Sequence, residues 1–129
     1  MSIFSAMRTS SSGMTAERFR MDVISQNIAG ANTIQTPTKD AYRRKEVVLS
    51  AEREGVRVSQ IVTDPTPLQI IFDPTNPYAD AQGNVRMSNV QPVIEMVNML
   101  GASRAYEANI AAFNSARSMA KAALNIGNI

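Results

Sequence analysis

The sequence of 129 residues contains no cysteine, no histidine and no tryptophan. Without Cys and His, the chain cannot offer thiol nucleophiles, imidazole general bases, disulfides or zinc sites of the usual nitrogen and sulfur type. Most enzyme chemistry is excluded with them, and we expect neither an enzyme nor a bound cofactor. A chain of this length is expected to form one modest domain, or one domain with extended arms.

The sequence also lacks a strong charge of either sign. Its 13 Lys and Arg against 11 Asp and Glu leave a net charge of +2, which divides as +1 over residues 1–34, zero over 35–92 and +1 over 93–129. No segment has the excess that binding to nucleic acid or an anionic membrane requires. We therefore expect partners that are held mainly by packing, with no nucleic acid and no direct membrane insertion.

A long apolar run is missing at the start of the chain. In MSIFSAMRTSSSG the apolar residues come singly, so we expect no cleaved signal peptide. The lack of Cys fits a cytosolic protein and an exported one equally well, and the compartment stays open on this ground.

Proline is absent from both ends, because all six prolines fall between residues 35 and 92. Both ends are thus free to be helical. This distribution predicts an N-terminal core helix in 1–34, a Pro-rich β or loop insertion in 35–91, and a C-terminal core helix in 92–129. We expect the two helical segments to form one core domain.

The N-terminal segment shows helical periodicity. Apolar side chains occupy six of eight positions spaced alternately by four and three residues, a heptad-like stripe. We expect a weak patch at 10–13, because glycine costs about 1 kcal/mol inside a helix, and an end near Gly30 and Asn32. The stripe consists of Ile3, Met7, Ser10, Met14, Glu17, Met21, Ile24 and Ile28.

The C-terminal segment has a longer stripe, which predicts a helix over 92–126, roughly 50 Å long. We expect Asn89 to cap its start, Pro92 to lie in its first turn and Glu95 to match the positive end of its dipole. The stripe consists of Met96, Met99, Ser103, Tyr106, Ile110, Phe113, Arg117, Ala120 and Leu124.

The middle segment alternates short β-like runs with turn residues. The apolar residues after Gly55 and those of 68–72 predict a small element of two or three strands, followed by an extended loop. Together these features predict a mainly α fold, in which long N- and C-terminal helices pair as a coiled-coil-like core around a small β or extended insertion.

The faces of the C-terminal helix away from its stripe are rich in alanine. A helix that is small and apolar nearly all round is usually buried on several sides, and a chain this short cannot supply all of that cover. This favours partners that are copies or relatives of the same protein. A self-contained helical hairpin is the alternative, because alanine is also the best helix former.

Three blocks of the sequence resemble the bacterial flagellar rod, hook and hook-associated family. They are SGMTAERFRMDVISQNIAGANT at 12–33, AYRRKEV at 41–47 and SRAYEANIAAFNSARSMAKAALNIG at 103–127. The middle, at 55–90, is similar to the basal-body members of the proximal rod. The resemblance covers nearly the whole chain.

The resemblance implies a structural protein of the flagellar rod that spans the periplasm and is exported by the flagellar type III apparatus without a cleaved signal. Expected partners are other rod proteins, copies of the chain, ring and export-gate proteins at the rod base, and a transient export chaperone or the export apparatus. The family's motif residues fall on Asn27, Ile28, Ala29, Asn32 and Thr33, and on Tyr106, Glu107, Ala108 and Asn109. Gly30 departs from the family, in which Asn is common at that position.

These arguments predict a set of core or subunit-interface residues. The set is Met14, Met21, Ile24, Asn27, Ile28, Asn32, Met96, Met99, Tyr106, Asn109, Ile110, Phe113 and Leu124. The basic cluster Arg43, Arg44 and Lys45 is either a solvated edge or a site of charge pairing with neighbouring subunits.

Two other functional classes compete with a rod subunit. A soluble helical adaptor would bind a partner helix in a discrete complex, and it should be a folded monomer or dimer in dilute solution. An acyl-serine enzyme would use Ser118 and Lys121, which match S-x-x-K, but its companion S-D-N and K-T-G elements are missing.

Overall fold

A computed structural model describes residues 2–128 of the chain. Two helices, α1 (Ile3–Gly30) and α2 (Pro92–Gly127), enclose four strands in the sequence. Helices therefore form at both ends of the chain, and a small β region lies between them, as the proline distribution predicted. Whether the helix pair is a coiled coil, and whether the two ends form one domain, remain predictions.

Helix α1 runs unbroken through the patch at 10–13, where the sequence predicted weakness. Its start is capped by Ser2, whose side chain accepts a hydrogen bond from the backbone of Ser5 at 3.0 Å. It ends at Gly30 as expected, but Gly30 does not adopt the left-handed conformation. Glycine is needed there for space, because a Cβ would lie 2.4 Å from the ring of Tyr42.

Helix α2 begins at Pro92, in the first turn as predicted. The expected cap is wrong: the N-cap position is Gln91, whose side chain makes no capping bond, and Asn89 serves a different purpose described below. Proline tolerates this start because it has no N–H to satisfy.

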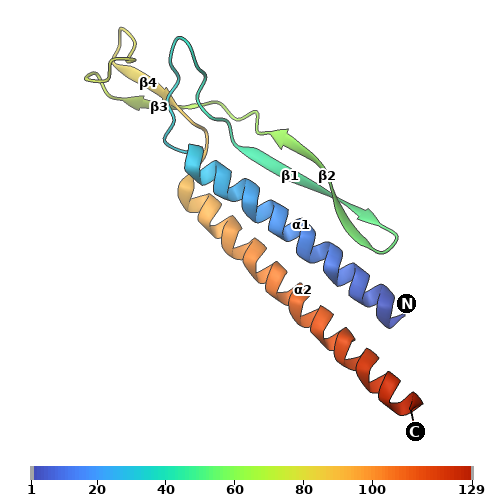
Figure 1. The fold of residues 1–129 in the computed structure, drawn as a ribbon. Coiled ribbons are helices and arrows are strands. Elements are labelled where there is room, and N and C mark those ends of the chain that lie inside the picture. The colour runs from blue at the N-terminus through green and yellow to red at the C-terminus, as the bar shows by residue number, and fades with distance from the viewer. Residues whose placement is uncertain (1, 129) are drawn as a thin grey trace.

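The molecule is elongated and has three layers along most of its length (Figure 1). α1 and α2 run antiparallel, and the β1–β2 hairpin lies along the other side of α1. Among the helices and strands of residues 2–128, α2 packs only against α1. α1 is thus covered on two sides, while α2 is covered on one.

The insertion contains two separate antiparallel hairpins rather than one element of two or three strands. β1 (Lys45–Glu52) pairs with β2 (Gly55–Thr63), and β3 (Gln69–Phe72) pairs with β4 (Asn84–Met87). The sequence predicted the regions of β2 and β3 and missed their partners. Each hairpin has a turn glycine with positive φ, 117° at Gly55 and 80° at Gly83.

The tip of the β1–β2 hairpin is fastened to the first half of α1. The backbone N–H of Val56 donates to Ser12 Oγ at 3.1 Å, and Arg8 Nε donates to Glu54 at 2.7 Å. Since the other end of the hairpin is also held, as shown below, the hairpin forms a strap along α1.

Within residues 2–128, neither helix has the length and hydropathy needed to cross a lipid bilayer.

Candidate subunit interface

The contact between the two helices is a seam of small side chains. A Cβ added at Gly13 would lie 2.7 Å from the amide of Asn109, while Ala102 and Ala116 are almost wholly buried. A second contact joins Asn27 of α1 to Glu95 of α2. From the first contact to the second, both helices advance by fourteen residues, from Gly13 to Asn27 on α1 and from Asn109 to Glu95 on α2. The helices therefore keep one register over four turns.

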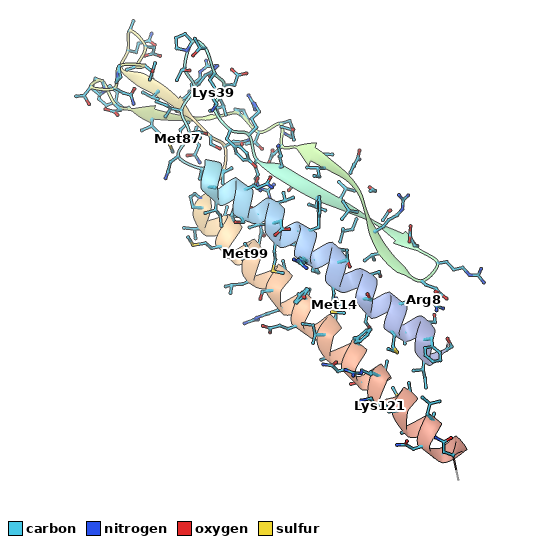
Figure 2. The ribbon with its side chains drawn as sticks, in the orientation of Figure 1. Arg8, Met14, Lys39, Met87, Met99 and Lys121 are labelled. Carbon is cyan, nitrogen blue, oxygen red and sulfur yellow. The ribbon has the colours of Figure 1, made fainter. Side chains whose placement is uncertain are left out.

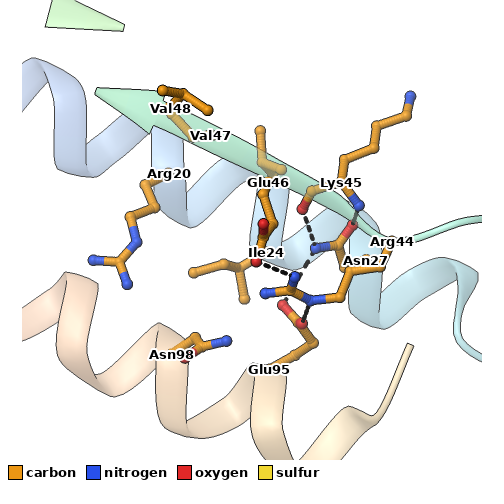
Figure 3. A pocket seen from close by; sticks show the side chains of 11 residues that line it. Arg20, Ile24, Asn27, Arg44, Lys45, Glu46, Val47, Val48, Glu95 and Asn98 are labelled. Carbon is orange, nitrogen blue, oxygen red and sulfur yellow. Dashed lines mark hydrogen bonds and ion pairs between the residues drawn. The ribbon is translucent and has the colours of Figure 1, made fainter. Parts of the chain in front are cut away.

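A buried polar cluster joins α1, the start of β1 and the start of α2 (Figure 3). We call it the polar junction, and its members are Asn27, Tyr42, Arg44, Asn89 and Glu95. Asn27 is 1 % exposed, and its amide uses its full hydrogen-bonding capacity. Its Nδ2 donates to Lys45 O at 2.9 Å and to Glu95 Oε2 at 3.2 Å, and its Oδ1 accepts from Lys45 N at 3.0 Å and from the Tyr42 hydroxyl at 2.8 Å.

Glu95 is the charged group at the centre of the polar junction, with a side chain 1 % exposed. From the sequence we expected Glu95 to interact with the dipole of α2, but its main partner is Arg44 Nε. Arg44 is distant from Glu95 in the sequence, and folding brings the two side chains together. Arg44 also pairs with Glu46 and with Asp64. A buried carboxylate needs such a partner, because an uncompensated charge in the interior is costly.

The polar junction shifts two ionisation equilibria. Burial opposes the charge of Arg44, but hydrogen bonds to Glu46 and Glu95 outweigh this effect and raise the pKa of the guanidinium. Burial, with a smaller contribution from the charge of Glu95, raises the pKa of the Tyr42 phenol above its ordinary value of 10.0.

Asn89 closes the polar junction instead of capping α2. Its Oδ1 accepts from the backbone N–H of Arg44 at 2.7 Å, and its Nδ2 donates to the carbonyl oxygens of Thr66 at 2.9 Å and Asp64 at 3.3 Å. The side chain thus ties the chain before β1 to the chain after β2. The hairpin strap is fixed at this end as well as at its tip.

The basic cluster takes part in contacts within the chain. Arg44 pairs with three carboxylates of its own chain, Glu46, Asp64 and Glu95, and its pairing with a neighbouring subunit remains a prediction. Arg43 is exposed and donates to Thr66 O at 3.3 Å, and exposed Lys45 has its Nζ 5.8 Å from the ring centre of Tyr42. For these two residues as well, pairing between subunits remains a prediction.

A cleft of about 290 Å³ lies beside the polar junction, between β1 and the two helices. Arg20, Ile24, Glu46, Val48 and Asn98 are among the residues lining it (Figure 3). Residues 2–128 contain no group of three or more acidic side chains placed to hold a metal ion.

The predicted interface residues fall into three groups by exposure. Ile24 and Asn27 are buried, and Figure 2 shows Met14 and Met99 between the helices. The half-buried members are Met14, Met21, Ile28, Met99, Tyr106, Asn109, Ile110 and Phe113. Asn32, Met96 and Leu124 are exposed.

Apart from Met96, the sequence analysis missed an exposed apolar surface of α2. Val93, Met96, Val97 and Leu100 are 54–73 % exposed, and they share the side of the helix opposite buried Glu95. We call this surface the outer face. Its signal is the spacing i, i+3, i+4 and i+7, which defines one side of a helix.

The end of α2 is also uncovered, because α2 extends past the beginning of α1 (Figure 1). The register places Met119 level with Ile3, so residues 120–127 project beyond the helix pair by about 12 Å. We call this segment the overhang. Leu124 is 67 % exposed and Ile126 is 72 % exposed.

In the comparison with known proteins, the segments that contain the two helices match family models of one kind of protein. The family model for "Flagella basal body rod protein" matches residues 7–34, and the model for "Flagellar basal body rod FlgEFG protein C-terminal" matches residues 81–126. The chain is similar to the flagellar basal-body rod proteins FlgC of Borreliella burgdorferi and Yersinia enterocolitica, each 39 % identical, and of Bacillus subtilis, 36 % identical. Each alignment covers 98 % of this chain and 98–99 % of the relative.

Proposed function

The chain belongs to the flagellar basal-body rod protein family, and from that premise we propose that it transmits torque by burying the outer face of α2 against neighbouring subunits. It is a structural subunit of the rod and not an enzyme. It assembles with other rod and basal-body components.

The observation that supports this proposal is the outer face itself. A soluble monomer rarely leaves four large apolar side chains together on one side of a helix, and such patches usually mark interaction sites. Val93, Met96, Val97 and Leu100 form such a patch, and no strand of the described chain covers it.

The total surface of the chain supports the same conclusion. It exposes 8758 Å², whereas a compact monomer of 14.0 kDa is expected to expose about 6,700 Å². The excess of roughly 2,000 Å² is comparable with what two or three standard interfaces bury on one partner. We infer that a subunit of this shape buries its excess surface only within the assembly.

Torque transmission requires a subunit that does not deform under load. The small-residue seam brings α1 and α2 into close contact, and the polar junction fixes their register through Asn27 and Glu95. The hairpin strap is held at both ends. These features make the subunit stiff, and the apolar outer face provides adhesion between subunits.

The wider setting is proposed on the same basis. The rod that contains this subunit spans the periplasm, and the chain reaches it by flagellar type III export without a cleaved signal. Further partners are ring and export-gate proteins, and a chaperone or the export apparatus during transit. The exposed predicted residues Met96 and Leu124 contact neighbouring subunits, and the helices pair as a coiled coil.

The test places a charge on the outer face. Leu100→Asp should lower the amount of the chain in purified basal bodies at least tenfold and abolish swimming, because burying an unpaired carboxylate opposes assembly. Leu100→Met keeps the apolar surface and should swim normally. Ser59→Asp adds the same charge on exposed β2 and should also swim normally.

Export and stability separate the expected defect from its alternatives. The Leu100→Asp chain should still reach the culture medium or periplasm, and its thermal unfolding should match that of the unsubstituted chain. Normal incorporation of Leu100→Asp would refute the proposed interface. A discrete soluble complex together with a complete rod lacking this chain would instead identify an adaptor.

A further inference from the structure

The β3–β4 hairpin has an open apolar face. The hairpin lies at the end of the molecule away from both chain termini (Figure 1), and among the helices and strands of residues 2–128 its two strands contact only each other. Ile70 is 66 % exposed and Phe72 is 71 % exposed. They lie on one face because side chains two residues apart along a strand point the same way. Large apolar side chains exposed together usually mark an interaction site.

The outer edge of β3 has no partner strand. At the opposite edge of the hairpin, β4 is joined by Ile34, which forms a β-bridge with Met87. Within residues 2–128, no strand or bridge pairs with the free side of β3. Natural proteins often protect such an edge with charged residues, but β3 has the sequence QIIF and contains none. The edge is therefore a template for an added strand.

The backbone groups that point to this edge are those of Ile70 and Phe72. Along an antiparallel strand, residues that exchange hydrogen bonds with the opposite strand alternate with residues whose N–H and C=O point away from it. Asp73 N donates to Gly83 O at 2.8 Å, so the residues one and three positions before Asp73 point away from β4. The carbonyl oxygen of Arg86, opposite Ile70, fits this alternation because it accepts a hydrogen bond from the far side of β4.

Two arginines lie beside the open face. Arg86 is opposite Ile70 in the register, and Arg43 lines a cleft of about 310 Å³ together with these two residues. Within residues 2–128, neither arginine lies within ion-pair distance of a carboxylate. Arg43 donates to Thr66 O at 3.3 Å, which leaves most of its five N–H donors free. Asp40 is the one acidic residue that lines this cleft, so the lining has an excess of one positive charge.

The carboxylates of the β3–β4 loop are bound by the loop itself. Asp80 accepts hydrogen bonds from the backbone N–H groups of Gln82 and Asn84, each at 2.9 Å. Asp73 accepts a hydrogen bond from the Thr75 hydroxyl at 2.8 Å. An acidic side chain from outside can therefore reach the two arginines without displacing an ion pair.

The strands of this chain do not offer a free acidic side chain. β2, β3 and β4 contain no Asp or Glu. In β1, Glu46 is paired with Arg44, and Glu52 is paired with Arg57 at 3.0 Å. Pairing of β3 with a strand of a second copy would thus leave the two arginines of the cleft without a carboxylate. This favours a partner of different sequence.

We propose that the free edge of β3 binds an extended segment of another protein, which adds a strand to the hairpin and places an acidic side chain beside Arg43 and Arg86. The backbone groups of Ile70 and Phe72 hydrogen-bond to the added strand, and their side chains pack against its apolar residues. The paired stretch is short, because β3 has 4 residues. This surface is separate from the outer face of α2, so the interaction goes beyond the proposed function.

The first experiment identifies the bound segment by photo-crosslinking in assembled basal bodies. Ile70→p-benzoylphenylalanine reports on the β3 edge. The matched control is Ile61→p-benzoylphenylalanine, at an isoleucine of β2 that is 46 % exposed. Crosslinked peptides are identified by mass spectrometry, with an unirradiated sample in parallel. Adducts at position 70 should map to a stretch of another protein with alternating apolar residues and at least one Asp or Glu, and the control should not label that stretch.

The second experiment tests how the segment is held, by measuring the adduct yield at position 70 in four variants. Phe72→Pro removes an N–H at the free edge and keeps the hydrogen bonds to β4, and it should lower the yield about tenfold. Phe72→Ala removes only the side chain and should lower the yield less. Arg86→Glu should lower the yield about fivefold, whereas Arg86→Lys keeps the charge and should retain the yield.

The outcomes separate this inference from its competitors. Adducts to a helix, to a copy of this chain or to a segment without an acidic residue would overturn it, and so would the absence of adducts in assembled rods. An undiminished yield with Phe72→Pro would contradict strand addition, and an undiminished yield with Arg86→Glu would contradict the acidic contact. The proposed function depends on Leu100→Asp instead, and none of these results would alter it.

Discussion

The strongest prediction concerns the ion pair between Arg44 and Glu95. Arg44→Met would remove the cation from a carboxylate that is 1 % exposed. Glu95 would keep one hydrogen bond, from Asn27 Nδ2 at 3.2 Å, but its charge would be left without a counter-ion. Glu46 and Asp64 would lose the same partner, although both are more exposed than Glu95.

The magnitude follows from this burial. Breaking a buried ion pair by removing one member typically costs 3–5 kcal/mol, and we expect about 3 kcal/mol because 18 % of the Arg44 side chain is exposed. Replacing both members with apolar groups removes the unpaired charge. The double variant Arg44→Met/Glu95→Met should therefore be more stable than Arg44→Met alone.

The assay is urea and thermal unfolding of the purified chain, followed by far-ultraviolet circular dichroism. Arg44→Met should lower the melting temperature by roughly 10 °C. The matched control is Arg8→Met, which breaks another arginine–glutamate pair, of 2.7 Å, whose side chains are 61 % and 39 % exposed. Arg8→Met should leave stability unchanged within error, since exposed pairs contribute little. Equal effects of the two variants, or a double variant less stable than Arg44→Met, would refute this account of the polar junction.

Two further predictions use glycine and tyrosine positions. Gly101→Ala should stabilise the chain by about 1 kcal/mol, because alanine favours the helix and nothing lies within 4 Å of the new methyl group. Gly30→Ala should destabilise it, because the new Cβ would press against the Tyr42 ring. Changes of opposite sign in the free energy of urea unfolding would confirm this prediction, and changes of the same sign would contradict it. The raised pKa of Tyr42 means that the folded state holds its phenol proton more tightly than the unfolded state, so this contribution to stability is complete below pH 10 and is lost as the pH rises through the folded pKa. An ultraviolet titration should show a phenol that ionises above the ordinary range, and Tyr42→Phe should remove that component. Its persistence in the variant would assign it to another residue.

The helices could be predicted from the sequence because their signals are local. The 3/4 spacing and the proline-free ends predicted an N-terminal helix within 1–34 that ends near Gly30 and a C-terminal helix over 92–126, and the structure has helices over 3–30 and 92–127. Two strands were missed for equally local reasons. In β1 the register shifts between Val48 and Leu49, which breaks the alternation of a regular strand, and β4 contains Val85 and Met87 as its only large apolar residues, whereas β3 contains three.

The polar junction could not be predicted, because its contacts join distant parts of the chain. Near a helix start, the interaction of Glu95 with the helix dipole is a sufficient local explanation. Asn89 likewise has a sufficient local explanation as a helix cap. Their true partners include Arg44, which is 51 residues from Glu95 and 45 from Asn89. Only the packing of the insertion against both helices brings these groups together.

The unequal lengths of α1 and α2, with 28 and 36 residues, suggest a mechanical consequence for the proposed assembly. If neighbouring subunits pack along α2, the ends of their helices lie at different levels along the rod axis. We therefore expect that a twisting or bending force cannot separate the subunits in one plane without also breaking helices.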